Sequence, residues 1–253
     1  MDYLPGKFVW FEHLSNDVAK ARAFYEPLFN WHVERMPMGD QTYNMILNGS
    51  AGIGGLRTAE AGKPSRWISY LSVIDVDASF QTATAAGAKA LQAPTNYDPV
   101  GRGATLADPT GAELCLWTSR DGDAPDVDQA PVGGWFWNEL WTPDVKKALT
   151  FYETVFGYTR DSMDMGAQGT YYLLKKGDKM RAGVMQSTEP KAPPMWLPYV
   201  RVDDCDASTA KAGKLGGRTL LAPTDVPGVG RFAILQDTAG AALAIIKAVP
   251  LSA

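Results

Sequence analysis

The sequence is poor in cysteine and histidine. It contains 2 cysteines and 2 histidines among 253 residues. Two thiols cannot build a disulfide framework, so we interpret Cys115 and Cys205 as reduced, structural residues. Two imidazoles cannot supply a pair of sites that each need several histidine ligands.

Basic clusters and long apolar runs are also missing. The formal net charge is -4, and without a Lys/Arg cluster there is no electrostatic basis for binding nucleic acid or an anionic membrane. No stretch reaches the roughly 18 apolar residues that a bilayer span requires. The N-terminal segment also lacks the pattern of a secretory signal. We therefore expect a cytoplasmic protein with neither nucleic-acid nor membrane partners.

The second half of the chain repeats the first. The segment from Trp10 to Tyr25 aligns without a gap with the segment from Trp137 to Tyr152, and both begin with Trp-x-Glu. Residues 119–134 are rich in Asp, Gly and Pro and separate the copies, as expected of a linker. The repeat indicates a tandem duplication. We predict domains over 1–120 and 134–253, with a linker over 121–133.

Each copy contains two βαβββ units. In the first copy a strand at 8–14 precedes Asp17, which suits a helix cap, and the next apolar positions share one helical face. Short strands follow at 31–36, 43–47 and 53–57, and the order repeats from Trp67 with a helix over 77–86 and strands at 88–92, 102–107 and 113–117. The predicted fold class is α+β.

Three motifs resemble the vicinal oxygen chelate superfamily of glyoxalases, bleomycin-resistance proteins and extradiol dioxygenases. They are Asp-Val-x-x-Ala-x-x-Phe-Tyr, starting at Asp17 and Asp144, Tyr-x-x-Val-x-Asp-x-Asp, starting at Tyr70 and Tyr199, and Asp108-Pro-Thr-Gly111. The resemblance covers nearly the whole chain outside the linker and is nearest to bacterial tandem-domain, glyoxalase-like proteins. It implies paired βαβββ units that form a curled, incompletely closed barrel around a cavity.

The resemblance also implies where a metal ion would bind. Metal-binding members carry a His on the first strand, a His or Gln on the strand that opens the second unit, and a Glu on the last strand. The corresponding positions here are Trp10, Ile68 and Cys115, and in the second copy Trp137, Leu197 and Ala244. None is an imidazole or an oxygen ligand, and an indole N–H only donates hydrogen bonds. We therefore expect no metal cofactor.

Neither histidine replaces the missing ligands. Strand alternation places His13 on the face opposite Trp10 and Glu12, and the second copy has Leu140 at this position. His13 is therefore interpreted as a helix-packing residue. For His32, whose counterpart is a threonine, a surface or structural role is favoured.

The face that carries Trp10 and Glu12 is expected to line the cavity. A pocket rich in Trp and Tyr with a few polar groups suits a flat, partly apolar organic ligand, although the same aromatic residues would also serve as core. The predicted ligand-binding residues are Trp10, Tyr43, Tyr70, Arg102, Cys115, Trp117, Trp137, Tyr171, Tyr199 and Arg231.

Glu12 and Glu139 are the predicted catalytic residues. Both copies keep this carboxylate two residues after a Trp, and removal from water would make it a stronger base. The alternative is a buried, architectural ion pair with Arg102 or Arg231.

Three functions remain open. The favoured one is a module that binds a small organic molecule in metal-free cavities. The second is a glyoxalase-type lyase or isomerase, or an oxygenase relative, with Glu12 or Glu139 as base. The third is an interaction protein whose cavities are filled by side chains. A fused pair can complete internally what single-domain relatives complete by pairing, so a monomer is favoured over a homodimer.

Overall fold

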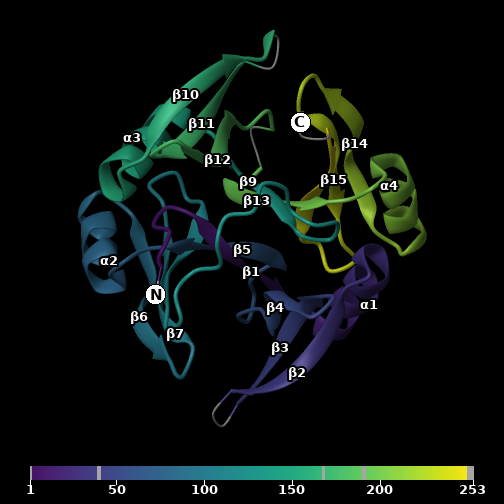
Figure 1. The fold of residues 1–253 in the computed structure, drawn as a ribbon, viewed down its shortest axis with the longest axis horizontal. Coiled ribbons are helices and arrows are strands. Elements are labelled where there is room, and N and C mark those ends of the chain that lie inside the picture. The colour runs from purple at the N-terminus through teal and green to yellow at the C-terminus, as the bar shows by residue number, and fades with distance from the viewer. Residues whose placement is uncertain (1, 39–40, 167–168, 190–191, 250–253) are drawn as a thin grey trace. The chain divides into compact units, whose positions relative to one another are not determined.

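The computed structural model describes residues 2–38, 41–166, 169–189 and 192–249. Over these residues the chain forms four βαβββ modules in succession (Figure 1). The predicted α+β class, with paired βαβββ units in two tandem copies, is confirmed.

The modules have the following bounds. The first comprises β1 (Phe8–Ser15), α1 (Val18–Phe29), β2 (His32–Met38), β3 (Gln41–Asn48) and β4 (Ala51–Thr58). The second comprises β5 (Arg66–Ser72), α2 (Val76–Ala85), β6 (Lys89–Tyr97), β7 (Gly101–Ala107) and β8 (Glu113–Ser119). The third comprises β9 (Trp135–Thr142), α3 (Val145–Phe156), β10 (Thr159–Asp164), β11 (Thr170–Lys176) and β12 (Lys179–Gln186). The fourth comprises β13 (Met195–Arg201), α4 (Cys205–Lys214), β14 (Arg218–Val226), β15 (Gly230–Gln236) and β16 (Ala242–Ala248).

The strands are ordered β2-β3-β4-β1-β5-β8-β7-β6 in the first copy and β10-β11-β12-β9-β13-β16-β15-β14 in the second. Within a module the last strand pairs in parallel with the first, as β4 does with β1, and the intervening strands pair as antiparallel hairpins. A parallel pair needs a long crossover, which the helix and the hairpin provide. The main difference from the predicted strands is β6, which continues through Pro94 to Tyr97 by means of register shifts opposite β7.

Each helix begins at an aspartate. Asp17 accepts a hydrogen bond from the backbone N–H of Lys20, and equivalent caps are formed by Asp75, Asp144 and Asp204. This satisfies one of the backbone donors that a helix N-terminus leaves unpaired. Among the described residues, no helix is long and apolar enough to cross a membrane.

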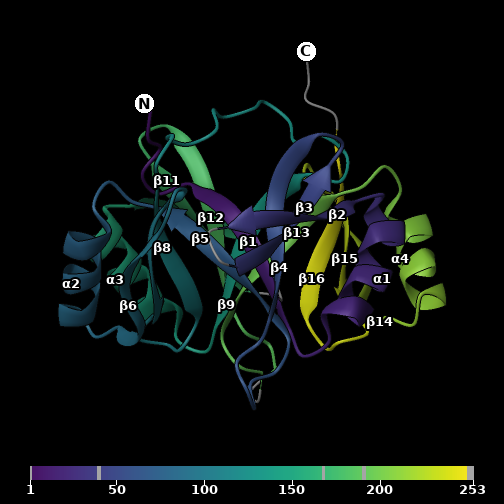
Figure 2. The same cartoon turned by 90° about the horizontal axis from the view of Figure 1, so that it is seen from below.

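Contacts divide the chain into two compact units that do not follow the sequence repeat. One unit contains Met1–Trp10, Ile68–Pro125 and Trp137–Trp196. The other contains Phe11–Trp67, Asp126–Phe136 and Leu197–Ala253. Each unit therefore combines a module of the first copy with a module of the second. Within the units, α2 lies beside α3 and α1 lies beside α4 (Figure 2).

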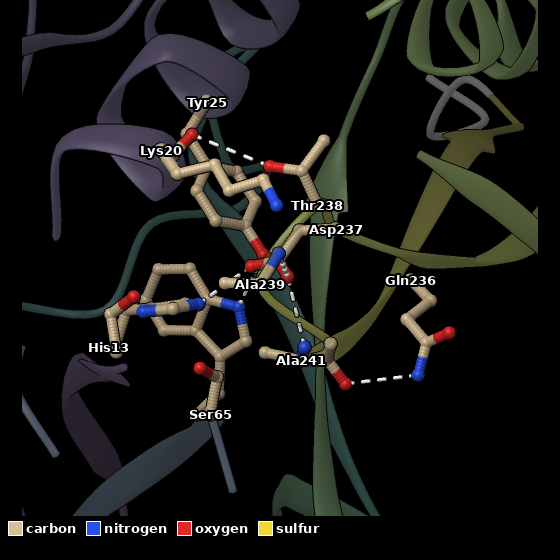
Figure 3. Close-up of polar contacts among 12 residues, drawn as sticks. His13, Lys20, Tyr25, Ser65, Gln236, Asp237, Thr238, Ala239 and Ala241 are labelled. Carbon is tan, nitrogen blue, oxygen red and sulfur yellow. Dashed lines mark hydrogen bonds and ion pairs between the residues drawn. The ribbon is translucent and has the colours of Figure 1, made fainter. Parts of the chain in front are cut away.

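A buried carboxylate holds the first and fourth modules together. Asp237, in the turn after β15, has its Oδ2 2.6 Å from His13 Nε2, and both side chains are fully buried (Figure 3). Tyr25 on α1 also hydrogen-bonds to Asp237, and its hydroxyl accepts from Trp67 Nε1 at 3.0 Å. His13 thus contacts the helix side of the sheet, which confirms its predicted position.

The electrostatics of this group favour an ionised aspartate. Burial by itself would raise the pKa of Asp237. The hydrogen bond and charge of His13, with donors from Ala241 and Tyr25, outweigh that penalty and hold the pKa of Asp237 below its ordinary value.

The second and third modules are joined by a related group without an imidazole. The Tyr152 hydroxyl donates to Asp108 Oδ2 at 3.0 Å and accepts from Trp196 Nε1 at 2.9 Å. Leu140, which is fully buried, occupies the place of His13. Burial, with the charge of Asp108, raises the pKa of Tyr152 well above its ordinary value, so this hydroxyl stays protonated.

The segments that precede β1 and β9 dock in matching ways. Trp31 Nε1 donates to the carbonyl of Gly133 at 2.7 Å, and Trp135 Nε1 donates to the carbonyl of Ile53 at 2.7 Å. In the other unit the Tyr158 hydroxyl donates to the carbonyl of Gly6 at 2.6 Å. The end of the predicted linker is therefore fixed by side-chain hydrogen bonds, as is the N-terminal segment.

We expect Asp237→Asn to destabilise the protein by about 1.5–3 kcal/mol at pH 7, because it removes a buried carboxylate that is hydrogen-bonded to His13, Tyr25 and Ala241. The pKa of Asp237 is lowered by folding, so its stabilising contribution is present above the ordinary aspartate pKa and is lost as the pH falls through the folded value. The difference between wild type and variant should therefore shrink below about pH 4. Urea unfolding across this pH range measures it.

The matched control is Asp225→Asn, since Asp225 pairs with Arg231 at 3.0 Å while its side chain is 76% exposed. It should cost less than about 1 kcal/mol. A cost for Asp237→Asn as small as that of the control would contradict the role given to the buried pair.

Candidate functional site

A buried glutamate and a tyrosine meet on one face of the first module. Glu12 on β1 is 2% exposed, and the hydroxyl of Tyr43 on β3 donates to Glu12 Oε1 at 2.9 Å. The strand between them, β4, carries Gly55 opposite both Glu12 and Met45. Tyr43 therefore reaches across an entire strand to contact the carboxylate.

Gly55 makes this contact possible. A Cβ at Gly55 would lie 1.8 Å from the Tyr43 hydroxyl oxygen and 3.1 Å from Glu12 Oε1. Such distances are far below van der Waals contact, so any side chain here would expel the tyrosine. A glycine weakens the strand, but here it allows the Tyr43 hydroxyl to approach the strand backbone closely.

The third module repeats the arrangement. Gly183 on β12 lies opposite Glu139 on β9, and a Cβ there would lie 1.8 Å from the Tyr171 hydroxyl oxygen. Tyr171 hydrogen-bonds to Glu139, and Trp137 Nε1 donates to the Tyr171 hydroxyl at 2.8 Å. Burial, followed by the charge of Glu139, raises the pKa of Tyr171 well above its ordinary value, so the phenol remains a hydrogen-bond donor.

The two glutamates differ in their further partners. Glu12 Oε2 lies 3.3 Å from Arg57 Nη1. Glu139 Oε1 accepts a hydrogen bond of 2.5 Å from Trp141 Nε1. Both carboxylates are thus supplied with donors, as a buried charge requires. In both copies a tyrosine hydroxyl meets a buried glutamate over a strand glycine, which we call the Tyr-Gly-Glu arrangement. The copies differ in the residues around it.

A separate aromatic group forms on the second module. Tyr70 and Trp117 lie 5.7 Å apart between ring centroids, and Tyr97 contacts Trp117 at 5.8 Å. Trp117 covers two glycines of β7, since a Cβ at Gly101 or Gly103 would come within 2.7 or 2.9 Å of its ring. The predicted residues Tyr70, Cys115 and Trp117 therefore share one face, with Tyr70 opposite Cys115 in register.

The fourth module has a different version of this group. Tyr199 is buried and contacts Phe232 at 6.1 Å. Phe232 lies opposite Ile246, where the second module has Gly103 opposite Trp117. The aromatic ring that packs against the tyrosine is therefore on β8, the last strand, in the second module and on β15, the neighbour of the last strand, in the fourth.

Arg102 and Arg231 occupy the other face of their strands, which corrects their predicted position. Arg102 Nε lies 2.7 Å from Asp77 Oδ2 in the first turn of α2, and Arg231 Nε lies 2.6 Å from Asp206 Oδ2 in the first turn of α4. Arg102 lies two residues before the buried Ala104, and Arg231 lies two residues before the buried Ala233. Residues two apart on a strand share a face, so both arginines face the helices. The cation beside Glu12 is Arg57, and the proposed architectural pair with Arg102 is wrong.

The residues at the superfamily's metal positions do not fit a metal ion. Ile68, Leu197 and Ala244 are buried aliphatic side chains, and Cys115 Sγ donates to the Leu116 carbonyl at 3.3 Å. Within the described ranges, no group of three or more His, Cys, Asp or Glu side chains could hold a metal ion. The donor set gives no basis for chemistry routed through a metal.

The histidines lie away from these faces. His13 is buried against Asp237 on the helix side of β1. His32 has a 66% exposed side chain, 3.7 Å from Glu26. Neither contributes to the Glu12 or Glu139 arrangement.

Comparisons with known proteins agree with this architecture. A glyoxalase-like domain model matches residues 10–117, and the model of the Glyoxalase/Bleomycin resistance protein/Dioxygenase superfamily matches residues 136–245. The chain belongs to this superfamily. CFP32 of Mycobacterium tuberculosis, named as a candidate glyoxylase, is 37% identical over 98% of this chain and 97% of its own length.

Two further proteins are similar to this chain. The anthracycline biosynthesis protein DnrV of Streptomyces peucetius is 29% identical over 97% of this chain and 94% of its own length. The Mn(II)-bound glyoxalase from Novosphingobium aromaticivorans has a TM-score of 0.66 at 18% identity, over 96% of this chain and 82% of its own. At that identity the likeness concerns the fold alone.

We expect Gly55→Ala to destabilise the protein by about 1–3 kcal/mol, since the added methyl group must displace the Tyr43 ring. Combining it with Tyr43→Ala should recover much of the cost, because the two positions compete for one space. Denaturant unfolding of the single and double variants measures this coupling. Gly213→Ala, a helical glycine with nothing within 4 Å of its Cβ position, is the control and should be neutral or stabilising. Additive effects would contradict the steric explanation.

Proposed function

We propose that this protein binds a small organic molecule with a flat aromatic part, at the faces that carry Glu12 and Glu139 and without a metal ion. The observation that carries the proposal is the Tyr-Gly-Glu arrangement, present in both copies. A strand glycine and a buried carboxylate both reduce stability, so their joint presence favours a role in ligand binding.

The surroundings of the two tyrosines support an aromatic ligand. Met36 lies directly opposite Tyr43, and Met163 lies directly opposite Tyr171. These methionines are 40% and 45% exposed, and thioethers pack well against aromatic rings. The carboxylate would accept a hydrogen bond from a ligand hydroxyl, which fixes its orientation.

The name of one relative supports this ligand class. DnrV is named for anthracycline biosynthesis, and anthracyclines contain fused planar rings. We extend only the flat aromatic character to the ligand of this chain.

The proposal predicts that 2-naphthol quenches tryptophan fluorescence saturably, with the same affinity before and after treatment with EDTA. The double variant Glu12→Gln, Glu139→Gln should bind at least about tenfold more weakly, because a hydrogen bond to a charged acceptor contributes about 1.5–3 kcal/mol. Glu60→Gln is the matched control, as Glu60 pairs with Arg66 in a 61% exposed setting. Undiminished binding by the double variant would remove the glutamates from the site, and loss of binding with EDTA would contradict a metal-free site.

A second candidate function is proton abstraction by Glu12 or Glu139, as in a glyoxalase-type isomerase or lyase. It is favoured by the burial of both carboxylates, at 2% and 5% exposure, at equivalent positions of β1 and β9. General-base catalysis of this kind contributes roughly 10²–10⁴-fold.

Hydroxyacetone in D₂O provides a direct test of the base. If Glu12 or Glu139 acts as one, the protein should accelerate exchange of the protons next to the carbonyl, followed by ¹H NMR, and the double Glu→Gln variant should lose at least about a hundredfold of that rate. Exchange no faster than in buffer, or equally fast in the variant, would leave ligand binding as the function.

A further inference from the structure

The two glutamate faces differ at the position two residues beyond the strand glycine. On β4, Arg57 follows Gly55 at this spacing and lies opposite Leu14. On β12, Met185 follows Gly183 at the same spacing and lies opposite Trp141. Residues two apart on a strand share a face, so each side chain lies on the same face as its glycine and glutamate.

In the first copy this position carries an accessible cation. The Arg57 side chain is 41% exposed, whereas Glu12, 3.3 Å away, has a side chain only 3% exposed. A guanidinium has five N–H donors in a planar fork that matches a carboxylate. A ligand that approaches Glu12 from solvent therefore meets the guanidinium before the buried carboxylate.

In the second copy the same position is apolar. Met185 is half-buried next to Trp141, whose indole N–H is directed to Glu139. Met163, 45% exposed, lies further along the face opposite Tyr171. A methionine and tryptophan surface of this kind favours an uncharged, polarizable ring.

The arginine of the second copy lies on the other side of its glycine. Arg181 precedes Gly183 by two residues, where the first copy has Ile53 before Gly55. Arg181 lies where the pairing of β11 with β12 shifts register, and its charge acts on the buried Tyr158. The second copy therefore has no counterpart of Arg57 two residues beyond its strand glycine.

We propose that Arg57 and Met185 determine different ligand classes for the two copies. The first copy takes an aromatic acid whose carboxylate contacts Arg57, and the second takes an aromatic compound that is uncharged at this position. The inference rests on the proposed ligand-binding function and adds the class of ligand and the residues that select it.

The test is calorimetric titration of the full chain with 2-naphthoate and 2-naphthol at pH 7. Arg57→Met should weaken 2-naphthoate binding at one site by about tenfold or more, the range of a charge-assisted hydrogen bond, and should change 2-naphthol affinity by less than about threefold. The matched control is Arg66→Met. Arg66 lies on β5 and pairs with Glu60, so its replacement should leave both affinities unchanged.

The reverse substitution gives an independent test should Arg57→Met fold poorly. Met185→Arg should strengthen 2-naphthoate binding at the second site and weaken that of 2-naphthol. Met180→Arg, on the same strand at a 58% exposed position, controls for the added charge.

The outcomes separate the two levels of the proposal. Binding of both compounds that neither Arg57→Met nor Met185→Arg alters would overturn the assigned selectivity and leave the proposed function standing. If wild-type protein binds neither compound, the proposed function fails, and the inference with it.

Discussion

A carboxylate taken out of water must be supplied with hydrogen-bond donors, and this constraint organises the fold described above. Four buried carboxylates mark its key positions. Asp108 and Asp237 receive tyrosine hydroxyls on the helix side of the sheets, and Glu12 and Glu139 receive tyrosine hydroxyls on the opposite face. The first pair joins modules of different copies, while the second pair provides the candidate sites. The same donor chemistry thus serves architecture on one side of each central strand and supplies the candidate sites on the other.

Duplication let the copies depart from one another without losing this pattern. His13 adds an imidazole to Asp237, where the other unit has only Leu140. Around the glutamates the change is in the neighbours, Arg57 in one copy and Trp141 in the other. The copies share a tyrosine donor at each buried carboxylate and differ in the additional partners of these carboxylates, His13, Arg57 and Trp141.

Local features were predictable from the sequence. The aspartates that begin the helices act through contacts three residues away, and strand alternation placed His13 and Glu12 on opposite faces. The contact between Tyr43 and Glu12 was not predicted, because it depends on the register of two strand pairs. In the sequence, the glycines of β4 and β12 were the visible sign of this contact.

Asp237 lies 224 residues from His13, beyond the reach of any local pattern. The face of Arg102 was predicted incorrectly. Its neighbour Gly103 lies against the Trp117 ring, so Arg102 must lie on the opposite face of the strand.

The docking of the two segments that precede β1 and β9 bears on how such a chain can be divided. Gly6 is held by Tyr158 of the second copy, and Gly133 is held by Trp31 of the first. The segment that precedes the first strand of each copy is thus hydrogen-bonded to a side chain of the other copy. A cut at the sequence boundary would produce two fragments that each leave a tyrosine or tryptophan donor unsatisfied. The repeat seen in the sequence is therefore the unit that was duplicated, while each compact unit of the structure takes about half of its residues from each copy.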